Sequence, residues 1–381
     1  MDEQLKNLRE RIDKLDDQLL SIFLERMSLC KEVGLKKEEI GKSVSDQLRE
    51  KEIIFRLANK TSEELKIYIK ELYDTIFYTS RAYQSKFINQ TSRTVEIIEN
   101  ILSKDLTEFP TSGSVACQGV YGANSGAAAE KLFPISQVTY FKNFEGVFNA
   151  VEKGLCEFGV LPIENSTAGS VSEVYDLMRK YDFHIVKSVK VQIDHCLAGI
   201  NGCEIKNIKK VISHPQALMQ CAEYIKKLSV ETESCENTAV AAQKVAQLND
   251  GTVAVLCSKS CAKAYSLKIL EPCVQDSQKN YTRFICITKN LRIYKGANKI
   301  SIMTSLAHTP GALNKIVSRF YAFNLNLTKI ESRPIEGSDF EFMFYFDFEG
   351  DVLDKNVRNL IAELDNGSDK FVLLGSYKES V

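Results

Sequence analysis

The chain has 381 residues, enough for two or three domains, and its hydrophobic fraction of 44% is ordinary for a globular protein. Lysine and arginine (49) balance aspartate and glutamate (50), so the chain lacks the basic excess that a non-specific nucleic-acid binder needs. Eleven scattered cysteines without a CxxC pair and only four histidines argue against a disulfide framework, a zinc ribbon and a histidine-rich metal site. The N-terminal MDEQLKNLRE has no apolar secretory core, and no apolar run approaches the roughly 20 residues of a membrane span, so we expect a cytoplasmic protein with reduced thiols.

Residues 1–90 are predicted to be helical, because apolar side chains recur at spacings of three and four without an intervening proline. The first helix carries Leu5, Leu8, Ile12, Leu15, Leu19, Ile22, Leu29 and Val33, and Gly34 is its expected end. A second helix is expected at about 45–60 with Ser45 as its cap, and a third at about 62–88 beginning at Ser62. A helix of about 30 residues is about 45 Å long, too long to be covered within one small domain. We therefore expect the helices to form a homodimer, and the whole chain a homodimer or homotetramer.

Charged and polar side chains interrupt these apolar helices. Position 26 falls in the apolar seam, yet it is Arg26, and a charge there is costly unless it is paired. Such an arginine can also extend from the flank of a helix or fix its register. The polar residues around it favour a pocket that binds an anion; they are Arg9, Lys37, Asp46, Arg49, Glu50, Ser80 and Gln84.

The segment LRERIDKLDDQLLSIFLERMSLCKEVG, with the D-x-x-R-E of Asp46, Arg49 and Glu50 that follows, resembles the all-α chorismate mutases. The resemblance implies that Arg9 and Arg26 hold the carboxylates of the substrate, one of them supplied by the partner subunit. It also implies that Asp46 and Arg49 line the site. The rearrangement is pericyclic and needs no nucleophile and no cofactor, only a site that holds a dianion in a compact shape and stabilises charge on the ether oxygen.

The same resemblance assigns roles to the other polar residues. It implies that Lys37 and Gln84 bond the breaking ether oxygen. Glu50 would bind the ring hydroxyl and Ser80 would support a carboxylate. Some relatives carry a glutamate at the Gln84 position, which must stay protonated. Because this chain has an amide there, we expect mutase activity without a strong acid requirement.

Residues 91–112 contain a charged stretch and then FPTSGS, whose Pro, Ser and Gly predict a linker. Over residues 113–290 short apolar strands such as VTYF, FGVLPIE and TVAVLCS alternate with helical segments. This alternation predicts an α/β domain with parallel strands, long enough to form two lobes around a cleft.

Several short motifs follow one another in this α/β region: ENST (164–167), IDHCLAG (193–199), SHPQALMQC (213–221), ENTAVAA (236–242) and NYTRF (280–284). Alone, ENST and SHPQ are common loop or helix-cap compositions, and His195 and His214 are expected to be structural. Together, and in this order, the motifs resemble prephenate dehydratase over nearly all of 113–290. The resemblance implies a two-lobed fold like that of periplasmic binding proteins, with the site in the cleft.

Carried over motif by motif, the implied dehydratase site consists of Asn165, with Glu164 beside it, Ser213, Gln220 and Thr282. Arg283 is expected to support the local geometry or the charge of the substrate. The reaction removes carbon dioxide and the ring hydroxyl from prephenate, driven by aromatisation. A threonine hydroxyl is a poor acid, so Thr282 is expected to donate a hydrogen bond to the departing oxygen; full proton transfer stays an alternative.

The glycine-rich turn GANSGAAAE departs from the pattern of these relatives, which have an aromatic residue where this chain has Asn124. The turn opens a helix and is expected to line the cleft. Asn124 is therefore expected to alter substrate preference or to lower activity.

Residues 298–376 predict a βαββαβ order, which is ferredoxin-like, with one helix opened by Pro310 and another at 354–365. By itself this order indicates only a generic α+β interaction domain. PGALNKIV (310–317) and KIESRPIEG (329–337) resemble the ACT regulatory domain. The resemblance implies L-phenylalanine binding near a helix N-terminus whose N–H groups suit a carboxylate, at a subunit interface. The implied contacts are Gly311, Ala312, Leu313, Glu331, Ser332, Arg333 and Pro334.

Taken together, the three regions resemble the bifunctional chorismate mutase/prephenate dehydratase family, in the same order. The match implies conversion of chorismate to prephenate and then to phenylpyruvate, with feedback inhibition by L-phenylalanine and without a metal or other cofactor. Two alternatives stay open. One is a small-molecule sensor whose two-lobed domain has lost catalysis, and the other is a dehydratase for arogenate, the aminated substrate.

Overall fold

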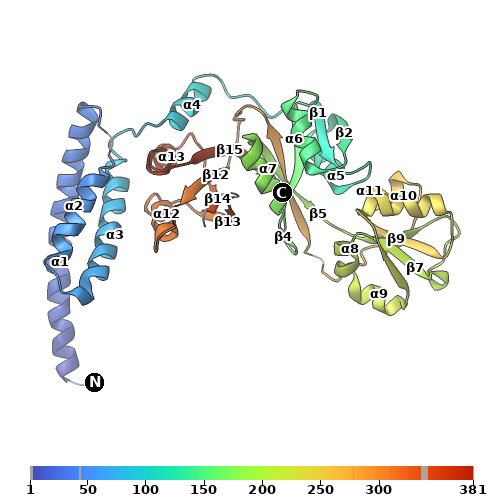
Figure 1. Cartoon of the computed structure of the whole chain (residues 1–381), viewed down its shortest axis with the longest axis horizontal. Coiled ribbons are helices and arrows are strands. Elements are labelled where there is room, and N and C mark those ends of the chain that lie inside the picture. Colours follow the sequence, from blue (N-terminus) through green and yellow to red (C-terminus); the bar gives the residue numbers. More distant parts are fainter. Residues whose placement is uncertain (1–2, 43, 278, 307, 336–341, 381) are drawn as a thin grey trace. The chain divides into compact units, whose positions relative to one another are not determined.

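The computed structural model describes residues 3–42, 44–277, 279–306, 308–335 and 342–380 (Figure 1). The chain divides into two compact units. The first consists of Met1–Lys104 with Ser301–Leu373, and the second of Asp105–Ile300 with Leu374–Val381. Within the described residues, no helix combines the length and the apolar character that a bilayer crossing requires.

The N-terminal part of the first unit is helical, as its apolar spacing predicts. It consists of α1 (Glu3–Glu39), α2 (Gln47–Ala58), a 3-10 turn (Glu63–Leu65) and α3 (Lys66–Gln84). The predicted end of the first helix at Gly34 is wrong, because α1 continues to Glu39. Gly34 is instead buried where α1 meets α3, since an added Cβ would lie 3.2 Å from Gln84 Cγ.

The predicted cap of the second helix is also wrong. Asp46, not Ser45, precedes α2, and its carboxylate accepts a hydrogen bond from the backbone N–H of Arg49 at 3.1 Å. An aspartate places a full negative charge at the positive end of the helix, so it is a stronger cap than the hydroxyl of a serine one residue earlier. Ser62 does precede the 3-10 turn, but its side chain makes no capping hydrogen bond.

The apolar stripe of α1 remains exposed in the single chain. Leu8, Leu15 and Ile22 are 52%, 62% and 63% exposed. Large apolar side chains in a row along a helix face usually mark a surface that another protein covers.

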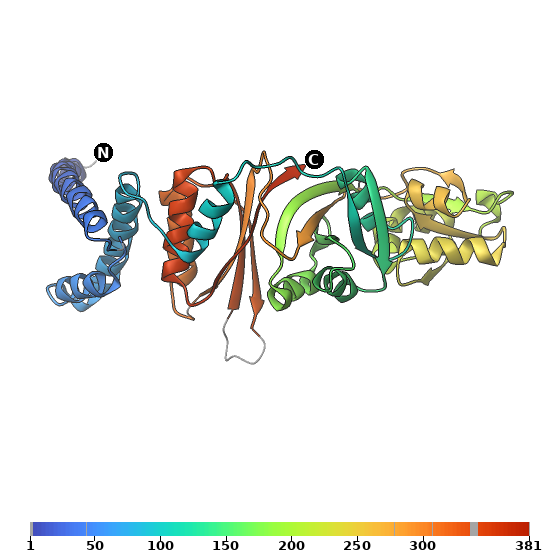
Figure 2. The same ribbon diagram turned by 90° about the horizontal axis from the view of Figure 1, so that it is seen from above.

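The first unit also contains a four-stranded sheet with two helices. Its elements are β12 (Lys299–Leu306), α12 (Ala312–Ala322), β13 (Leu327–Pro334), β14 (Phe342–Glu349), α13 (Lys355–Gly367) and β15 (Phe371–Ser380). The first two residues of β12 and the part of β15 from Leu374 onward belong to the second unit. The strand order is β13-β14-β12-β15, and Figure 2 shows α12 and α13 on one face of this sheet. Two residues of the KIESRPIEG motif, Glu336 and Gly337, and the first two of the predicted strand FEFMFYFDFEG, Phe340 and Glu341, lie outside the described residues.

The predicted linker 91–112 contains a helix, α4 (Arg93–Leu102). It packs against α13, with Val95 and Ile98 buried. The backbone N–H of Thr94 donates to the carboxylate of Asp365 on α13 at 3.1 Å. A helix this short has little stability of its own, so it forms because α13 covers its apolar face.

The second unit has two α/β lobes. The first lobe contains β1 (Ser112–Gln118), α5 (Asn124–Leu132), β2 (Ile135–Phe141), α6 (Phe144–Glu152), β3 (Phe158–Asn165), β4 (Gly169–Ser170), α7 (Ser172–Tyr181), β5 (His184–Gln192) and β11 (Tyr281–Thr288). Its strands run in the order β15-β5-β11-β3-β1-β2. β1 is parallel to β2 and β3, whereas β11 is antiparallel to β3 and β5. The prediction of parallel strands fails at β11, because this strand returns from the other lobe.

The second lobe is inserted between β5 and β11. Its elements are β6 (Cys196–Gly199), β7 (Lys210–Ser213), α8 (Pro215–Gln220), α9 (Ala222–Leu228), β8 (Glu231–Ser234), α10 (Thr238–Leu248), β9 (Val253–Cys257), α11 (Lys259–Ala264) and β10 (Lys268–Glu271), with strand order β10-β6-β9-β7-β8. β7 is parallel to β8 and β9, as predicted, but β6 is antiparallel to both β9 and β10, so the prediction of parallel strands is also wrong for this pair of contacts.

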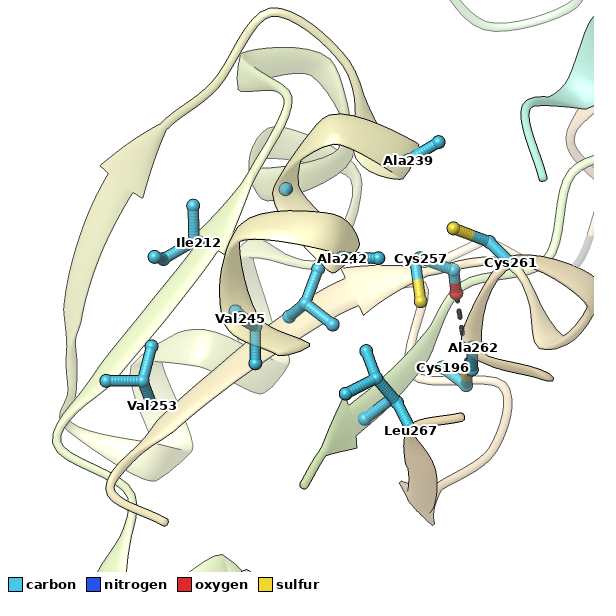
Figure 3. Close-up of a cluster of buried hydrophobic side chains, with 13 residues drawn as sticks. Cys196, Ile212, Ala239, Ala242, Val245, Val253, Cys257, Cys261, Ala262 and Leu267 are labelled. Carbon is cyan, nitrogen blue, oxygen red and sulfur yellow. Dashed lines mark hydrogen bonds between the residues drawn. The ribbon is translucent and has the colours of Figure 1, made fainter. Parts of the chain in front are cut away.

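The core of this lobe uses small side chains (Figure 3). Ala239, Ala242 and Val245 of α10 pack against β9, which allows the helix to lie close to the sheet. Cys196 and Cys257 fill the other end of this core, where the Cys196 thiol contacts the Cys257 carbonyl at 3.2 Å. All eleven cysteines of the chain are free thiols.

Candidate functional site

Helices α1 and α3 bring three of the predicted mutase residues together. Arg26 Nη1 donates to Ser80 Oγ at 2.6 Å, and Gln84 Nε2 donates to the carbonyl of Cys30 at 2.7 Å. Arg26 and Cys30 lie one turn apart on α1, as Ser80 and Gln84 do on α3, so the two pairs meet side by side. Ser80 and Gln84 are buried, and the Arg26 guanidinium lies 5.9 Å from the ring centre of Phe77.

The other predicted mutase residues lie outside this contact group. Lys37 Nζ donates to the carbonyl of Val44 at 2.8 Å. Arg49 forms an exposed ion pair with Glu52 at 3.1 Å. Asp46 caps α2, and Glu50 forms an ion pair with Arg81 of α3.

Arg9 lies on the same helix as Arg26. At 1.5 Å per residue, the two are about 25 Å apart along α1. One chain therefore cannot place both arginines around one small substrate, so a site that uses both requires a second copy.

A cavity of about 340 Å³ lies between the two lobes of the second unit. Both lobes contribute polar side chains to its wall: Gln118, Asn124, Ser125, Asn165, His195, His214, Gln216, Gln220, Glu236, Asn237, Thr238 and Thr282. Among the described residues that line it, there is no lysine or arginine. An anion in this cavity would therefore be held by hydroxyl, amide and backbone N–H groups.

Thr282 and Asn165 are register partners at the end of β3 and the start of β11. Asn165 Nδ2 donates to Thr282 Oγ1 at 2.9 Å and to Asn280 Oδ1 at 2.8 Å. Asn165 Oδ1 accepts from the backbone N–H groups of Thr167 and Ala168 at 3.0 and 2.8 Å, which fixes the orientation of the amide. Because Thr282 Oγ1 accepts from Asn165, its own O–H is available to donate into the cavity.

Asn280 was missed by the sequence analysis, although it lies in the NYTRF motif. It is 2% exposed and orients Asn165, which in turn orients Thr282. The sequence did contain an indication of its role. Asn280 is an amide close to Thr282, in a segment that leads into a buried strand, and a buried amide needs hydrogen-bond partners.

Gln220 is the third predicted dehydratase residue on the cavity wall. Its Oε1 lies 3.0 Å from Nε2 of His195, which also lines the cavity. Burial lowers the pKa of His195, so the ring is neutral near pH 7 and its Nε2–H can donate to Gln220. His214 lines the cavity too and caps α8, its Nδ1 accepting from the backbone N–H of Gln216 at 3.2 Å. The sequence did not indicate that either histidine reaches the cavity.

Ser213 does not line the cavity. It is fully buried between strands, where its Oγ donates to the Leu256 carbonyl at 2.6 Å. The structure thus brings Asn165, Gln220 and Thr282 together at one cavity and places Ser213 behind its wall.

Asn124 lies at the cavity, at the start of α5. The residue before it, Ala123, provides no side-chain cap, so the first N–H groups of this helix are not used by a side chain. Such a helix N-terminus favours an anion.

Arg283 is turned away from Thr282, because successive residues of a strand point to opposite faces. Its guanidinium lies 3.4 Å from Glu379 and 3.6 Å from Glu164. Neither Arg283 nor Glu164 lines the cavity. Both side chains therefore stabilise β11 from the face opposite the cavity and are not placed to contact a ligand inside it.

Glu379, in β15, is the centre of a group of charges that is buried except for the partly exposed Lys190. Lys299 Nζ and Lys190 Nζ lie 2.8 and 3.0 Å from its carboxylate. Burial alone would raise the pKa of Glu379, but the two ammonium groups and Arg283 outweigh it and lower the pKa to about 2.

Replacing Glu379 with glutamine is expected to lower the free energy of unfolding by about 3 kcal/mol at pH 7, because the buried Arg283 and Lys299 and the partly exposed Lys190 lose their carboxylate. The pKa in the folded state lies below the ordinary value of 4.5, so this stabilisation is complete above pH 4.5 and is lost as the pH falls toward 2. Urea unfolding of both proteins at pH 7 and pH 3 measures the difference. Glu152→Gln, which breaks an exposed ion pair with Lys289, is the control and should change stability by less than about 1 kcal/mol. An equal effect of Glu379→Gln at both pH values would contradict this assignment.

The predicted effector residues lie on two elements of the first unit. Gly311 precedes α12 with φ of 81°, a conformation that favours glycine, and Ala312 and Leu313 form the first turn. The other four lie on β13, at the edge of the sheet order, where Glu331 and Arg333 alternate with Ser332 and Pro334.

Comparison with known proteins matches two family models to the chain. The model described as chorismate mutase type II matches residues 8–85, and the one described as prephenate dehydratase matches residues 115–292. These ranges contain, respectively, the α1–α3 contact group and the whole of the inter-lobe cavity.

Individual relatives agree with these models. The bifunctional chorismate mutase/prephenate dehydratase of Escherichia coli (strain K12) is 30% identical and covers 97% of this chain and 95% of its own. The chloroplastic arogenate dehydratase/prephenate dehydratase 2 of Arabidopsis thaliana is 39% identical over 72% of this chain and 76% of its own. Among solved structures, the prephenate dehydratase of Arthrobacter aurescens in complex with L-Phe superposes with a TM-score of 0.64 at 26% identity, covering 69% of this chain and 89% of its own.

Proposed function

This chain belongs to the bifunctional chorismate mutase/prephenate dehydratase family, and on that premise we propose how its residues carry out the two reactions. It is an enzyme of phenylalanine biosynthesis with a mutase and a dehydratase domain. The helical domain converts chorismate to prephenate, and the two-lobed domain converts prephenate to phenylpyruvate. The observation that carries the second assignment is the Thr282 hydroxyl, oriented by Asn165 at the wall of the cavity.

In the mutase reaction, the protein holds chorismate in its compact conformation and stabilises the charge that grows on the ether oxygen. Arg26, supported by Ser80, binds one carboxylate of the substrate, and Arg9 of a second copy binds the other. Gln84 and Lys37 donate to the ether oxygen when substrate displaces their present carbonyl partners. The exposed apolar stripe of α1 and the separation of Arg9 from Arg26 support a homodimer, or a homotetramer built from it.

The amide of Gln84 has no proton to lose in the neutral range. The mutase kcat is therefore expected to vary by less than about twofold between pH 6 and 8, whereas a Gln84→Glu variant should lose activity as the pH rises because its carboxyl must stay protonated. Initial rates with saturating chorismate across this range measure both. A steep fall of kcat in the unmodified protein would argue against this role of Gln84.

In the dehydratase reaction, carbon dioxide leaves the quaternary ring carbon of prephenate and hydroxide leaves the opposite carbon. The electron pair of the broken carbon–carbon bond enters the ring and makes it aromatic. Thr282 donates a hydrogen bond to the departing hydroxyl. Because this donor is already in position, it stabilises the negative charge that develops on that oxygen. Gln220, held by His195, and the start of α5 position the carboxylates.

The C-terminal βαββαβ region acts as an ACT regulatory domain that binds L-phenylalanine. The helix start at Gly311 and the ESRP residues on β13 are the candidate contacts, and the L-Phe complex of the Arthrobacter relative supports the choice of effector. The cytoplasm is the proposed location.

Arogenate is a second candidate substrate of the dehydratase. It carries an ammonium group, and the described part of the cavity wall contains Glu236 but no lysine or arginine. The Arabidopsis relative has a name that includes both substrates. Comparing kcat/KM for prephenate and arogenate decides which one is preferred.

The function is tested by supplying chorismate to the purified full-length protein and following prephenate and phenylpyruvate separately, with and without L-phenylalanine. Both products should form, and L-phenylalanine should reduce phenylpyruvate formation. If neither product forms, the catalytic function is refuted in favour of the sensor alternative. If both form and L-phenylalanine has no effect, only the regulatory assignment fails.

A further inference from the structure

Four charged side chains meet where α2 and α3 contact α12 and α13, all within the first unit. This charge cluster consists of Glu50 (α2), Arg81 (α3), Arg319 (α12) and Glu363 (α13). Arg81 Nε lies 2.9 Å from Glu363 Oε1, and Arg319 Nε lies 3.4 Å from the same oxygen. Arg81 Nη1 also contacts Glu50 Oε1. One guanidinium therefore links a glutamate of the mutase helices to a glutamate of the C-terminal region.

The cluster is shielded from water at its centre. The side chains of Arg81 and Glu363 are 11% and 3% exposed. Burial lowers the pKa of Arg81, but Glu363 and Glu50 more than offset this and the pKa is raised, so Arg81 stays a cation. Within the described residues, Glu363 Oε2 has no hydrogen-bond partner, so both arginines act on the other oxygen. Ion pairs this buried are held firmly, because an unpaired charge there would cost several kcal/mol.

Arg81 follows Ser80 directly on α3. Ser80 contacts Arg26 of α1, whereas Arg81 contacts Glu50 of α2, so two successive residues of α3 engage two proposed substrate-binding residues. A cavity of about 530 Å³ adjoins the cluster, and all four of its side chains and Phe77 line it. Glu50 thus borders this cavity and is held by its ion pair with Arg81.

We propose that Arg81 is a positioning residue of the mutase, which holds the carboxylate of Glu50 in place for the substrate, and that Glu363 of α13 sets the position of Arg81. The inference rests on the proposed function, in which Glu50 binds the ring hydroxyl of chorismate. It assigns the C-terminal region a direct role in the mutase reaction, separate from any effector site.

The Arg81 guanidinium contacts two carboxylates, and this arrangement explains how Glu363 can influence substrate binding by Glu50. Glu363 engages Nε, so Arg81 offers only Nη1 to one oxygen of Glu50, and the other oxygen stays available to accept from a hydroxyl. Without Glu363, the planar fork of Arg81 can pair with both oxygens of Glu50. Glu50 then has no oxygen left for the substrate.

The test measures mutase kinetics of the full-length protein carrying Glu363→Gln. This change preserves the shape of the side chain but replaces its carboxylate with a neutral amide, which binds the guanidinium too weakly to hold Nε in competition with the carboxylate of Glu50. The KM for chorismate should rise about tenfold, the size of effect expected when a hydrogen bond to a charged group is lost, with kcat changed less than about twofold. Arg81→Gln should also raise KM, and Arg81→Lys should recover part of the loss. Because the proposal has Glu363 affect the KM for chorismate through Arg81, the double variant should resemble Arg81→Gln alone rather than add the two effects.

Lys315→Gln is the matched control. It breaks the ion pair of Lys315 with Asp74 at 2.9 Å, in the same contact between α12 and α3, but leaves the charge cluster intact. It should not change KM, and none of the variants should change dehydratase rates with supplied prephenate. An unchanged KM in folded Glu363→Gln, additive effects in the double variant, or an equal effect of Lys315→Gln would overturn the proposal. If the unmodified protein makes no prephenate, the mutase function itself fails, which is a distinguishable result.

Discussion

Replacing Thr282 with valine should lower the dehydratase kcat by about 10²- to 10³-fold and leave the mutase rate unchanged. Valine preserves the size and branching of threonine but removes the hydroxyl that Asn165 orients toward the cavity. A lost donor at a departing or developing oxyanion typically costs this much, because no water replaces it in a closed site. Phenylpyruvate formation from supplied prephenate, measured beside prephenate formation from chorismate, separates the two activities.

Thr282→Ser is the matched control for this prediction. It keeps the hydroxyl and its hydrogen bond from Asn165, so it should retain dehydratase activity to within about tenfold. If valine and serine lower kcat equally, the side chain acts through packing and not through its hydroxyl. A loss of mutase activity in either folded variant would show that the two sites are not independent.

Replacing Arg26 with alanine should lower mutase kcat/KM by about 10³-fold while dehydratase activity on supplied prephenate is retained. The change removes a cation proposed to bind a substrate carboxylate and frees Ser80, which accepts from it at 2.6 Å. Loss of one charge-assisted, bidentate contact and of its positioning effect accounts for a change of this size. Arg26→Lys, which keeps the charge without the planar fork, should be intermediate.

The same variant tests whether each site is shared between two copies. Arg9→Ala and Arg26→Ala chains should each be inactive as mutases. Mixing them in a dimer that exchanges subunits should restore about a quarter of the activity, because half of the dimers are mixed and one of their two sites carries neither change. No recovery after proven exchange would mean that Arg9 and Arg26 do not serve one site across the dimer.

Much of this protein is determined by local sequence. The spacing of Leu5 through Val33 predicts the long first helix, and the alternation of apolar runs predicts the α/β region, because both depend on periodicity within a few turns or strands. The motifs around Asn165, Gln220 and Thr282 predicted that these residues lie together, and all three line one cavity, whereas Ser213 of the same prediction does not; their roles in catalysis stay predictions. The helix limits predicted at Gly34 and Ser45 were wrong. Gly34 allows close packing against Gln84 instead of ending α1, and Asp46 rather than Ser45 caps α2.

Tertiary structure decided which of the polar residues meet, and at which cavity. The sequence places Thr282 and Arg283 side by side but cannot say which face of β11 borders the cleft, and the fold turns Arg283 to Glu379 instead. His195 reaches the site through a contact with Gln220, which no local pattern indicates. The ion pair of Arg81 with Glu363 joins residues 282 positions apart. Periodicity describes the faces of one helix or strand, whereas contacts between elements depend on how the whole chain packs, so only the folded structure could reveal them.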